Sequence, residues 1–165
     1  MPEGRAYVAT SPGRSSSRAA FRQLLTYGDG EYNQAFRFLF EPVVLVHWDL
    51  ALEPDDVEAF ERAIAQSPDE VHVAPFRLWP FSTGLDRPVW AHRHADLSWI
   101  RDGDERAELV SFGCIYLPKR ALEVARSCDI WCASVEHVEE TISFSRAWGA
   151  GGRVCWDCRP KHLNW

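Results

Sequence analysis

The segment that most constrains the fold is residues 43–52, in which an unbroken apolar run precedes two polar residues. Its first four residues are all apolar, which is typical of a strand covered on both faces. His47 and Asp49 come late in this strand, and Pro54 then opens a helical pattern that runs to about Gln66. Proline suits the first turn of a helix. A buried strand followed closely by a helix is the repeating unit of α/β proteins.

The other segments alternate in the same way. Apolar runs predict further strands at residues 5–10, 71–79, 109–117 and 153–157. Apolar spacing at three and four residues predicts helices at residues 17–27, 31–40, 118–127 and 136–148. Residues 80–108 have a weak pattern and are expected to form loops with one short strand. We therefore expect one α/β domain over residues 1–165, with a mainly parallel, mixed sheet flanked by helices.

Composition and charge exclude several classes of protein. The chain of 165 residues is 46% hydrophobic and contains eight tryptophans, so it can bury a core and is not expected to be disordered. Its formal net charge is −6 and its arginines are scattered, which argues against a free-standing nucleic-acid binder. No run approaches the roughly 20 apolar residues of a membrane span. The absence of an apolar leader and the odd number of cysteines favour a cytoplasmic protein with reduced thiols.

Asp49 is the first candidate site residue. In open parallel sheets, ligands bind beyond the carboxyl ends of the strands, and Asp49 follows a buried strand at such an end. A carboxylate in this position can hold a hard cation or a ribose. The alternative interpretation is a solvated aspartate at a strand end.

Several motifs follow one another in an order that resembles the inverting GT-A glycosyltransferases of the large family-two group. The resemblance covers roughly residues 30–165 and rests on five segments. Residues 30–35 (GEYNQA) resemble the asparagine-containing helix start before the D-x-D strand, the strand 43–49 with Pro54 after it resembles that strand and its helix, and Phe112-Gly113-Cys114 with Lys119-Arg120 resembles the acceptor-side strand and helix. Glu139-Glu140 with Arg146 and Gly149 resembles the Glu-Asp helix, and the last strand from Arg153 with His162 after it resembles the final strand with its metal histidine.

The resemblance implies a GT-A-like fold and a metal-assisted transfer. A nucleoside-diphosphate sugar would be the donor, and Mn²⁺ or Mg²⁺ would bridge its phosphates, held by Asp49 and His162. Oxygen and imidazole ligands suit Mn²⁺. Glu140 would act as the base that takes the proton from an acceptor hydroxyl, with inversion at the anomeric carbon.

The same resemblance gives donor contacts and one reason to expect a partner. Arg14, in the loop after the first strand, would meet the diphosphate, and Asn33 would contribute to the donor site. His47 replaces the first carboxylate of the D-x-D motif and would serve as a metal ligand or a phosphate contact. The stretch before Asn33 is too short for the usual second βα unit, so a homo-oligomer or a partner subunit is expected to complete the site. The acceptor is not identified.

Two other classes of function remain open. The missing carboxylate at His47 is consistent with a non-catalytic binding or assembly domain on the same fold, with a degenerate metal site. The paired cysteines Cys128 and Cys132, and Cys155 and Cys158, are consistent with a small zinc-stabilised interaction module.

Two further clusters in the weakly patterned region are candidates for binding. His92, His94 and Asp96 have spacings that suit a metal site, and three tryptophans are candidates for stacking against a sugar ring: Trp79, Trp90 and Trp99. Structural roles are the alternative for every one of these residues.

Overall fold

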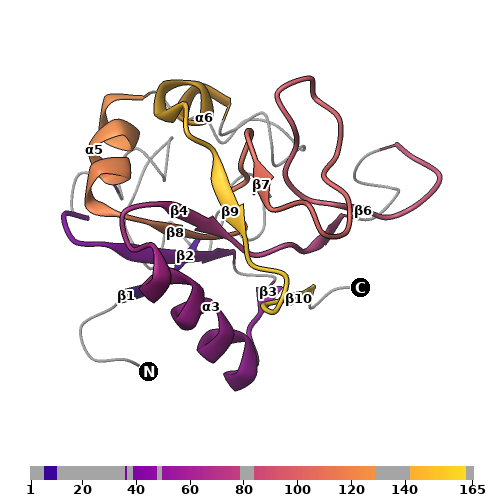
Figure 1. Ribbon diagram of the computed structural model, residues 1–165, viewed down its shortest axis with the longest axis horizontal. Coiled ribbons are helices and arrows are strands. Elements are labelled where there is room, and N and C mark those ends of the chain that lie inside the picture. The colour runs from indigo at the N-terminus through magenta and orange to yellow at the C-terminus, as the bar shows by residue number, and fades with distance from the viewer. Residues whose placement is uncertain are drawn as a thin grey trace.

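The computed structural model describes residues 6–10, 36, 39–47, 50–78, 84–128 and 142–162. Its main sheet has six strands in the order β1, β2, β8, β4, β9, β7 (Figure 1). Their bounds in that order are Ala6–Thr10, Val43–His47, Cys114–Leu117, Val71–Val73, Gly152–Val154 and Arg106–Ala107. Two small sheets pair β3 (Leu50–Ala51) with β10 (Lys161–His162) and β5 (Arg77–Leu78) with β6 (Val89–Trp90). The helices are α3 (Pro54–Gln66), α5 (Lys119–Ser127) and α6 (Ile142–Trp148).

The main sheet is mixed. Strands β1 and β2 are parallel, as are β4 and β9, whereas β8 runs antiparallel to both β2 and β4, and β7 antiparallel to β9. The predicted α/β class with a mixed sheet is confirmed. Four of the six strands point the same way, but three of the five neighbouring pairs are antiparallel. Two of these pairs arise because β8 is inserted between β2 and β4, and the third is β7 with β9. The expectation of a mainly parallel sheet therefore holds for strand direction and not for pairing.

Helices cover both faces of this sheet (Figure 1). Side chains alternate along β2, so that Val43 and Leu45 join one buried cluster with α5 and α6, while Val44 joins a second cluster with α3. The same alternation divides β8 between the two clusters. The continuously apolar strand at residues 43–46 is explained by this two-sided burial.

Helix α3 begins and ends where the sequence predicts. Pro54 occupies its first turn, and the Glu53 backbone N–H donates to the Asp56 carboxylate at 3.0 Å. Phe60 and Ile64 are buried against the sheet. A satisfied N-terminus and an apolar stripe together fix this helix, which carries the chain from β3 to the start of β4.

Two predicted strands are each divided in the structure. The segment 43–52 forms β2 and then β3, because the chain leaves the main sheet to pair with β10. The segment 71–79 forms β4 and then β5, because the chain turns away to pair with β6. The strand predicted at residues 109–117 is regular only as β8.

The predicted helices are also only partly described. The helix predicted at 31–40 does not include Leu39 and Phe40. The helix predicted at 17–27 and the first part of that at 136–148 lie outside the described residues. No helix in the described part of the chain has the length and apolar character needed to cross a bilayer.

Candidate functional site

Strand ends meet at one edge of the main sheet. Beyond the ends of β4 and β9, Ala74 N–H donates to Cys114 O at 3.0 Å and Cys155 N–H donates to Val73 O at 2.9 Å. At the end of β2, His47 N–H donates to Gly113 O at 2.6 Å. The carboxyl ends of β2, β4 and β9 and the start of β8 therefore form a common edge, which is where ligands bind in open α/β sheets.

His162 reaches this edge from the end of the described chain. Strand β10 runs antiparallel to β3, with His162 opposite Leu50, the residue that follows Asp49 in the sequence. The His162 ring also packs edge-to-face on Phe76, with ring centroids 5.5 Å apart. A backbone pairing and a ring contact together hold His162 beside Leu50 and Phe76.

Phe76 packs against two of the candidate histidines. Its ring meets His162 on one side and His92 on another, the latter at 5.8 Å between centroids. A Cβ atom added at Gly113 would lie 2.2 Å from Phe76 Cζ, so only glycine leaves room for this ring. The glycine directly before β8 thus has a packing reason in this chain.

His92 has a structural role. It is fully buried, its Nδ1 accepts a hydrogen bond from Ser111 N–H at 2.9 Å, and its Nε2–H donates to Ala74 O at 3.0 Å. Both ring nitrogens are occupied in one neutral tautomer, and burial lowers the pKa of His92 to about 4. The imidazole links the chain at residue 92 to Ala74, directly after β4, and to Ser111. It therefore has no nitrogen available for a metal.

His94 lies in a different environment. Its two nitrogens contact the carboxylates of Asp104, at 2.8 Å, and Glu108, at 3.1 Å. Partial burial lowers its pKa, but the hydrogen bonds to Asp104 and Glu108 outweigh burial and raise it overall. Asp96 instead accepts hydrogen bonds from Ser98. The cluster of His92, His94 and Asp96 suggested by spacing is therefore wrong as a metal site, and the described residues contain no other group of three or more metal-ligating side chains.

The described cysteines lie on opposite faces of the sheet. Cys128 packs with the α5 and α6 cluster, whereas Cys155 and Cys158 pack with the α3 cluster. Burial raises the pKa of Cys155 to about 11, and the neighbouring Cys114 thiol together with burial raises that of Cys158. Cys132 lies outside the described residues. These positions do not favour a shared four-cysteine zinc site.

The structure describes two of the six residues predicted to form the catalytic, donor and metal site. His162 is at the sheet edge, as above. His47 ends β2 and is only 2% exposed, so its ring faces the protein interior. The other four lie outside the described residues: Arg14, Asn33, Asp49 and Glu140.

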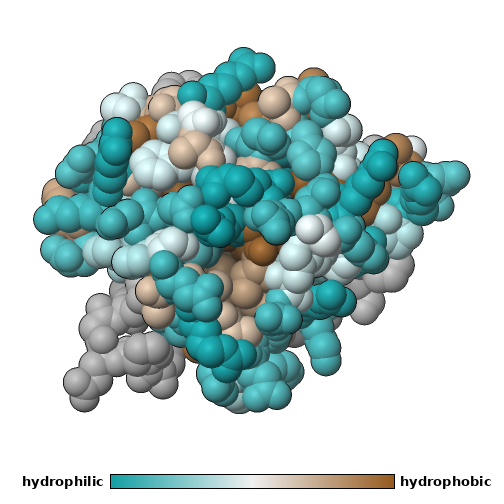
Figure 2. Space-filling view, viewed as in Figure 1, coloured by the Kyte–Doolittle hydropathy of each residue, from teal (hydrophilic) through white to brown (hydrophobic). Residues whose placement is uncertain are grey.

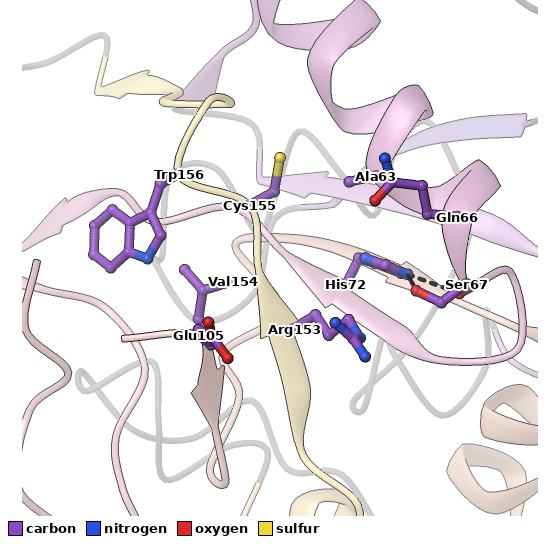
Figure 3. A pocket seen from close by; sticks show the side chains of 9 residues that line it. All are labelled: Ala63, Gln66, Ser67, His72, Glu105, Arg153, Val154, Cys155 and Trp156. Carbon is purple, nitrogen blue, oxygen red and sulfur yellow. Dashed lines mark hydrogen bonds between the residues drawn. The ribbon is translucent and has the colours of Figure 1, made fainter. Parts of the chain in front are cut away.

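Among the described residues, one pocket lies between α3 and β9 and is called the α3–β9 pocket. Its volume is about 440 Å³, and its lining includes Ser67, His72, Arg153 and Cys155. Figure 3 shows the His72 ring turned toward Ser67. In the view of Figure 2, apolar side chains are visible between α3 and β9 within a mostly hydrophilic surface.

The side chains of the α3–β9 pocket do not form an activated nucleophile. His72 Nε2 lies 2.8 Å from Ser67 O and 3.1 Å from Ser67 Oγ. A carbonyl oxygen only accepts, so this nitrogen carries its hydrogen and cannot take a proton from the hydroxyl. Cys155, with its raised pKa, is a neutral thiol at pH 7. The pocket therefore lacks a base paired with a nucleophile among the described residues.

A second pocket, called the β5–β6 pocket, has a volume of about 410 Å³. Three arginines and two tryptophans line it: Arg77, Arg87, Arg101, Trp90 and Trp99. Trp90 and Trp99 were candidates for sugar stacking from the sequence, with structural roles as the alternative, and Trp79 lies outside the described residues. The sequence did not single out the three arginines. These come from three separate segments, and no local pattern relates them.

Comparison with known proteins gives no family. No model of a protein family matches the chain, and no curated protein matches it closely enough to count as a relative.

Proposed function

We propose that this protein is a GT-A-like glycosyltransferase that moves a sugar from a nucleoside-diphosphate donor to an acceptor hydroxyl with a divalent cation. The observation that carries the proposal is the pairing of β10 with β3. It brings His162 opposite Leu50, the residue that follows Asp49, although His162 and Asp49 are far apart in the sequence. These are the two residues that the family resemblance gives as metal ligands.

The arrangement of the neighbouring strands also supports the proposal. The strand that resembles the D-x-D strand, β2, lies beside β8, which resembles the acceptor-side strand. Gly113, at the start of β8, is hydrogen-bonded to His47 at the end of β2. Donor-side and acceptor-side motifs would therefore face a common space at the sheet edge.

Each residue then has a chemical task. Carboxylate oxygen from Asp49 and imidazole nitrogen from His162 form a ligand set that suits Mn²⁺. A bound divalent cation would neutralise negative charge on the departing diphosphate. Glu140 would accept the proton of the acceptor hydroxyl as its oxygen bonds to the anomeric carbon and the bond to the diphosphate breaks.

The test is the thermal midpoint of the protein with a panel of nucleoside diphosphates and nucleotide-sugars, with and without Mn²⁺. A ligand that binds only the folded state, at a concentration of about 100 times its Kd, raises the free energy of unfolding by about 2.7 kcal/mol. For a chain of this size that corresponds to a rise of roughly 5–10 °C. We expect such a rise with one nucleotide, and only when Mn²⁺ is present.

Two variants make the test specific. His162→Phe keeps an aromatic ring against Phe76 but removes the nitrogens, so it should fold and lose the metal-dependent rise. Lys161→Ala, at the exposed neighbouring position in β10, should keep it. A rise that survives in His162→Phe, or the absence of any rise across the panel, would contradict the proposal.

The burial of His47 favours a second candidate function. A side chain that is 2% exposed in place of the first D-x-D carboxylate suits a domain that binds a nucleotide without transferring a sugar. Mn²⁺-dependent release of free sugar from the donor, followed by NMR without an acceptor, separates the two. Release supports the enzyme, whereas binding without release over many hours supports the binding domain.

A further inference from the structure

The β5–β6 pocket has an excess of positive charge. Among its lining residues are three arginines, and its one acidic residue, Asp102, accepts a hydrogen bond from Trp90 Nε1. None of the guanidinium groups of Arg77, Arg87 and Arg101 forms an ion pair with a carboxylate of the described residues. This concentration of unneutralised cations occurs in a protein whose overall charge is −6, so it favours an anionic ligand locally.

Arg77 is held in an orientation that suits oxyanion binding. Its guanidinium carbon lies 3.6 Å from the centroid of the Trp90 ring. Trp90 is itself fixed by an edge-to-face contact with Trp156, at 5.4 Å between centroids. A stacked guanidinium keeps its N–H donors in the plane of the group, where they can bind two oxygens of a carboxylate or phosphate.

The rest of the lining is apolar enough to meet the body of a ligand. Val89, Trp99 and Ile100 contribute to the walls, and Trp99 is fixed by Arg93, which lies 3.8 Å from its ring centroid. The volume of about 410 Å³ lies within the range of roughly 300–1,000 Å³ that is usual for small-molecule sites. Apolar walls with a few directed polar groups are typical of sites for a sugar or a molecule of similar size.

The pocket is linked to His162, one of the two proposed cation ligands, through the backbone of Phe76. Arg77 directly follows Phe76, whose ring packs on His162. The β5–β6 hairpin that bears the pocket is hydrogen-bonded back to this residue, through Ala91 N–H and Phe76 O at 2.9 Å. The strands that bear the pocket and the ring that contacts His162 are therefore joined at Phe76.

From these observations we infer that the β5–β6 pocket binds a sugar carrying an oxyanion, a carboxylate or a phosphate, and that this sugar is the acceptor. That this sugar is the acceptor rests on the proposed function, whereas the binding of an anionic sugar does not. Arg77 holds the oxyanion with its in-plane donors, Arg87 and Arg101 add positive charge at the rim, and the apolar walls contact the sugar ring.

The test is direct binding measured by ligand-detected NMR, with neither metal nor nucleotide present. The probes are glucuronate, glucose 6-phosphate, glucose and inorganic phosphate. We expect one of the two anionic sugars to bind at least about tenfold more tightly than both glucose and inorganic phosphate, and its affinity to fall as ionic strength rises. The tighter of the two identifies whether the oxyanion is a carboxylate or a phosphate.

Two pairs of variants locate the site. Arg77→Lys keeps the charge but loses the planar donors, and should weaken binding about tenfold or more. Arg101→Gln removes a rim charge and should weaken it several-fold. The same changes at Arg62, an exposed arginine of α3, serve as controls and should leave the affinity unchanged. Thermal midpoints of all variants confirm that each is folded.

Several outcomes would overturn the inference. One is that glucose or inorganic phosphate binds as tightly as the anionic sugars. A second is that Arg77→Lys is folded and retains full affinity, and a third is that a single-stranded oligonucleotide outcompetes both sugars. Because no metal or nucleotide is used, these failures are distinct from loss of the Mn²⁺-dependent rise in the His162 variants. Either proposal can therefore fail without the other.

Discussion

Phe76 is the residue on which the candidate site depends most. One ring contacts His92 and His162 and fills the space that any side chain at residue 113 would need. It joins the end of β4 to the start of β8 and to β10. A change in its position would therefore move the histidine that we propose as a metal ligand.

Gly113→Ala tests this dependence. The added methyl group cannot coexist with Phe76 in its present position, so we expect the free energy of unfolding to fall by about 1–3 kcal/mol. Urea unfolding measures the change. In the double variant with Phe76→Leu, the smaller side chain should relieve the overlap, so the two costs should not add. Strict additivity would show that the ring is not the obstacle.

The buried imidazole of His92 should make stability depend on pH. Its pKa in the folded protein is about 4, below the value of 6.5 in an unfolded chain, so the unfolded state binds the proton more readily. The stabilisation is complete above about pH 6.5 and is lost as the pH falls toward 4, a loss of roughly 3 kcal/mol. Urea unfolding between pH 7.5 and 4 measures it.

His92→Gln is the comparison for that pH profile. Glutamine has a donor and an acceptor but does not titrate, so the variant should show a shallower loss between pH 6.5 and 4. His94 works in the opposite sense, since its raised pKa stabilises the protein at low pH and the effect is lost as the pH rises. Because His94 is present in both proteins, the difference between them isolates residue 92. Identical pH profiles would contradict the assignment.

At the scale of elements, a glutamate at the start of β4 ties together two other strands. Glu70 accepts from Arg106 of β7, at 2.9 Å, and from Arg153 of β9. Slight burial raises its pKa, but the hydrogen bonds and charges of both arginines outweigh this and lower the pKa from 4.5 to about 2. The two outer strands β9 and β7 are thus held to the rest of the sheet by ion pairs as well as by backbone hydrogen bonds.

Glu70→Gln should reduce stability modestly. All three side chains are at least one-third exposed, so solvent screening limits the expected loss to about 0.5–1.5 kcal/mol at pH 7. The native carboxylate contributes fully above about pH 4.5, and its contribution is lost as the pH falls toward 2. Thermal melts from pH 7 to 3 should converge for the native protein and the variant. Asp69→Asn, a neighbouring change of the same charge, should have a smaller effect at pH 7.

The elements that the sequence predicts well are those with local causes. Helix α3 has a proline at its start and an apolar stripe, and both of its ends were predicted. Strand β2 is a run of apolar residues whose start was predicted, although the predicted strand continued to Leu52. Strands such as β5, β6 and β10 have two residues each, too few to show a periodic pattern. They form because distant partners are available, and those partners are set by the tertiary structure.

The candidate site divides in the same way. His162 was predicted from motif order, and the structure pairs it with Leu50, the residue that follows Asp49 in the sequence. Its role as a metal ligand stays a prediction. The role of Phe76 and the clustering of Arg77, Arg87 and Arg101 could not be predicted, because they depend on contacts between segments. His92 was a possible metal ligand on its spacing to His94 and Asp96. Its structural role could not be read from the sequence, because its two hydrogen-bond partners are remote in sequence.

At the scale of the whole molecule, the sheet separates two cores that are buried by different helices. The cluster under α3 supports the strand edge with Phe76 and Leu50, whereas the α5 and α6 cluster lies on the far side. Substitutions at the α5 and α6 residues of the second core should alter stability without moving His162, since the main sheet stands between them. Ile100 is an exception in that core, because it also lines the β5–β6 pocket.

The position of β8 has a consequence for how the chain matures on the ribosome. This strand is central in the sheet, yet it is made after β2 and β4, which both pair with it. Until residues 114–117 leave the exit tunnel, β2 has one open edge and β4 has two, because β9 is made later still. Exposed strand edges of this kind invite intermolecular pairing. Between the emergence of β4 and that of β8, the nascent chain should therefore be most exposed to pairing with other chains.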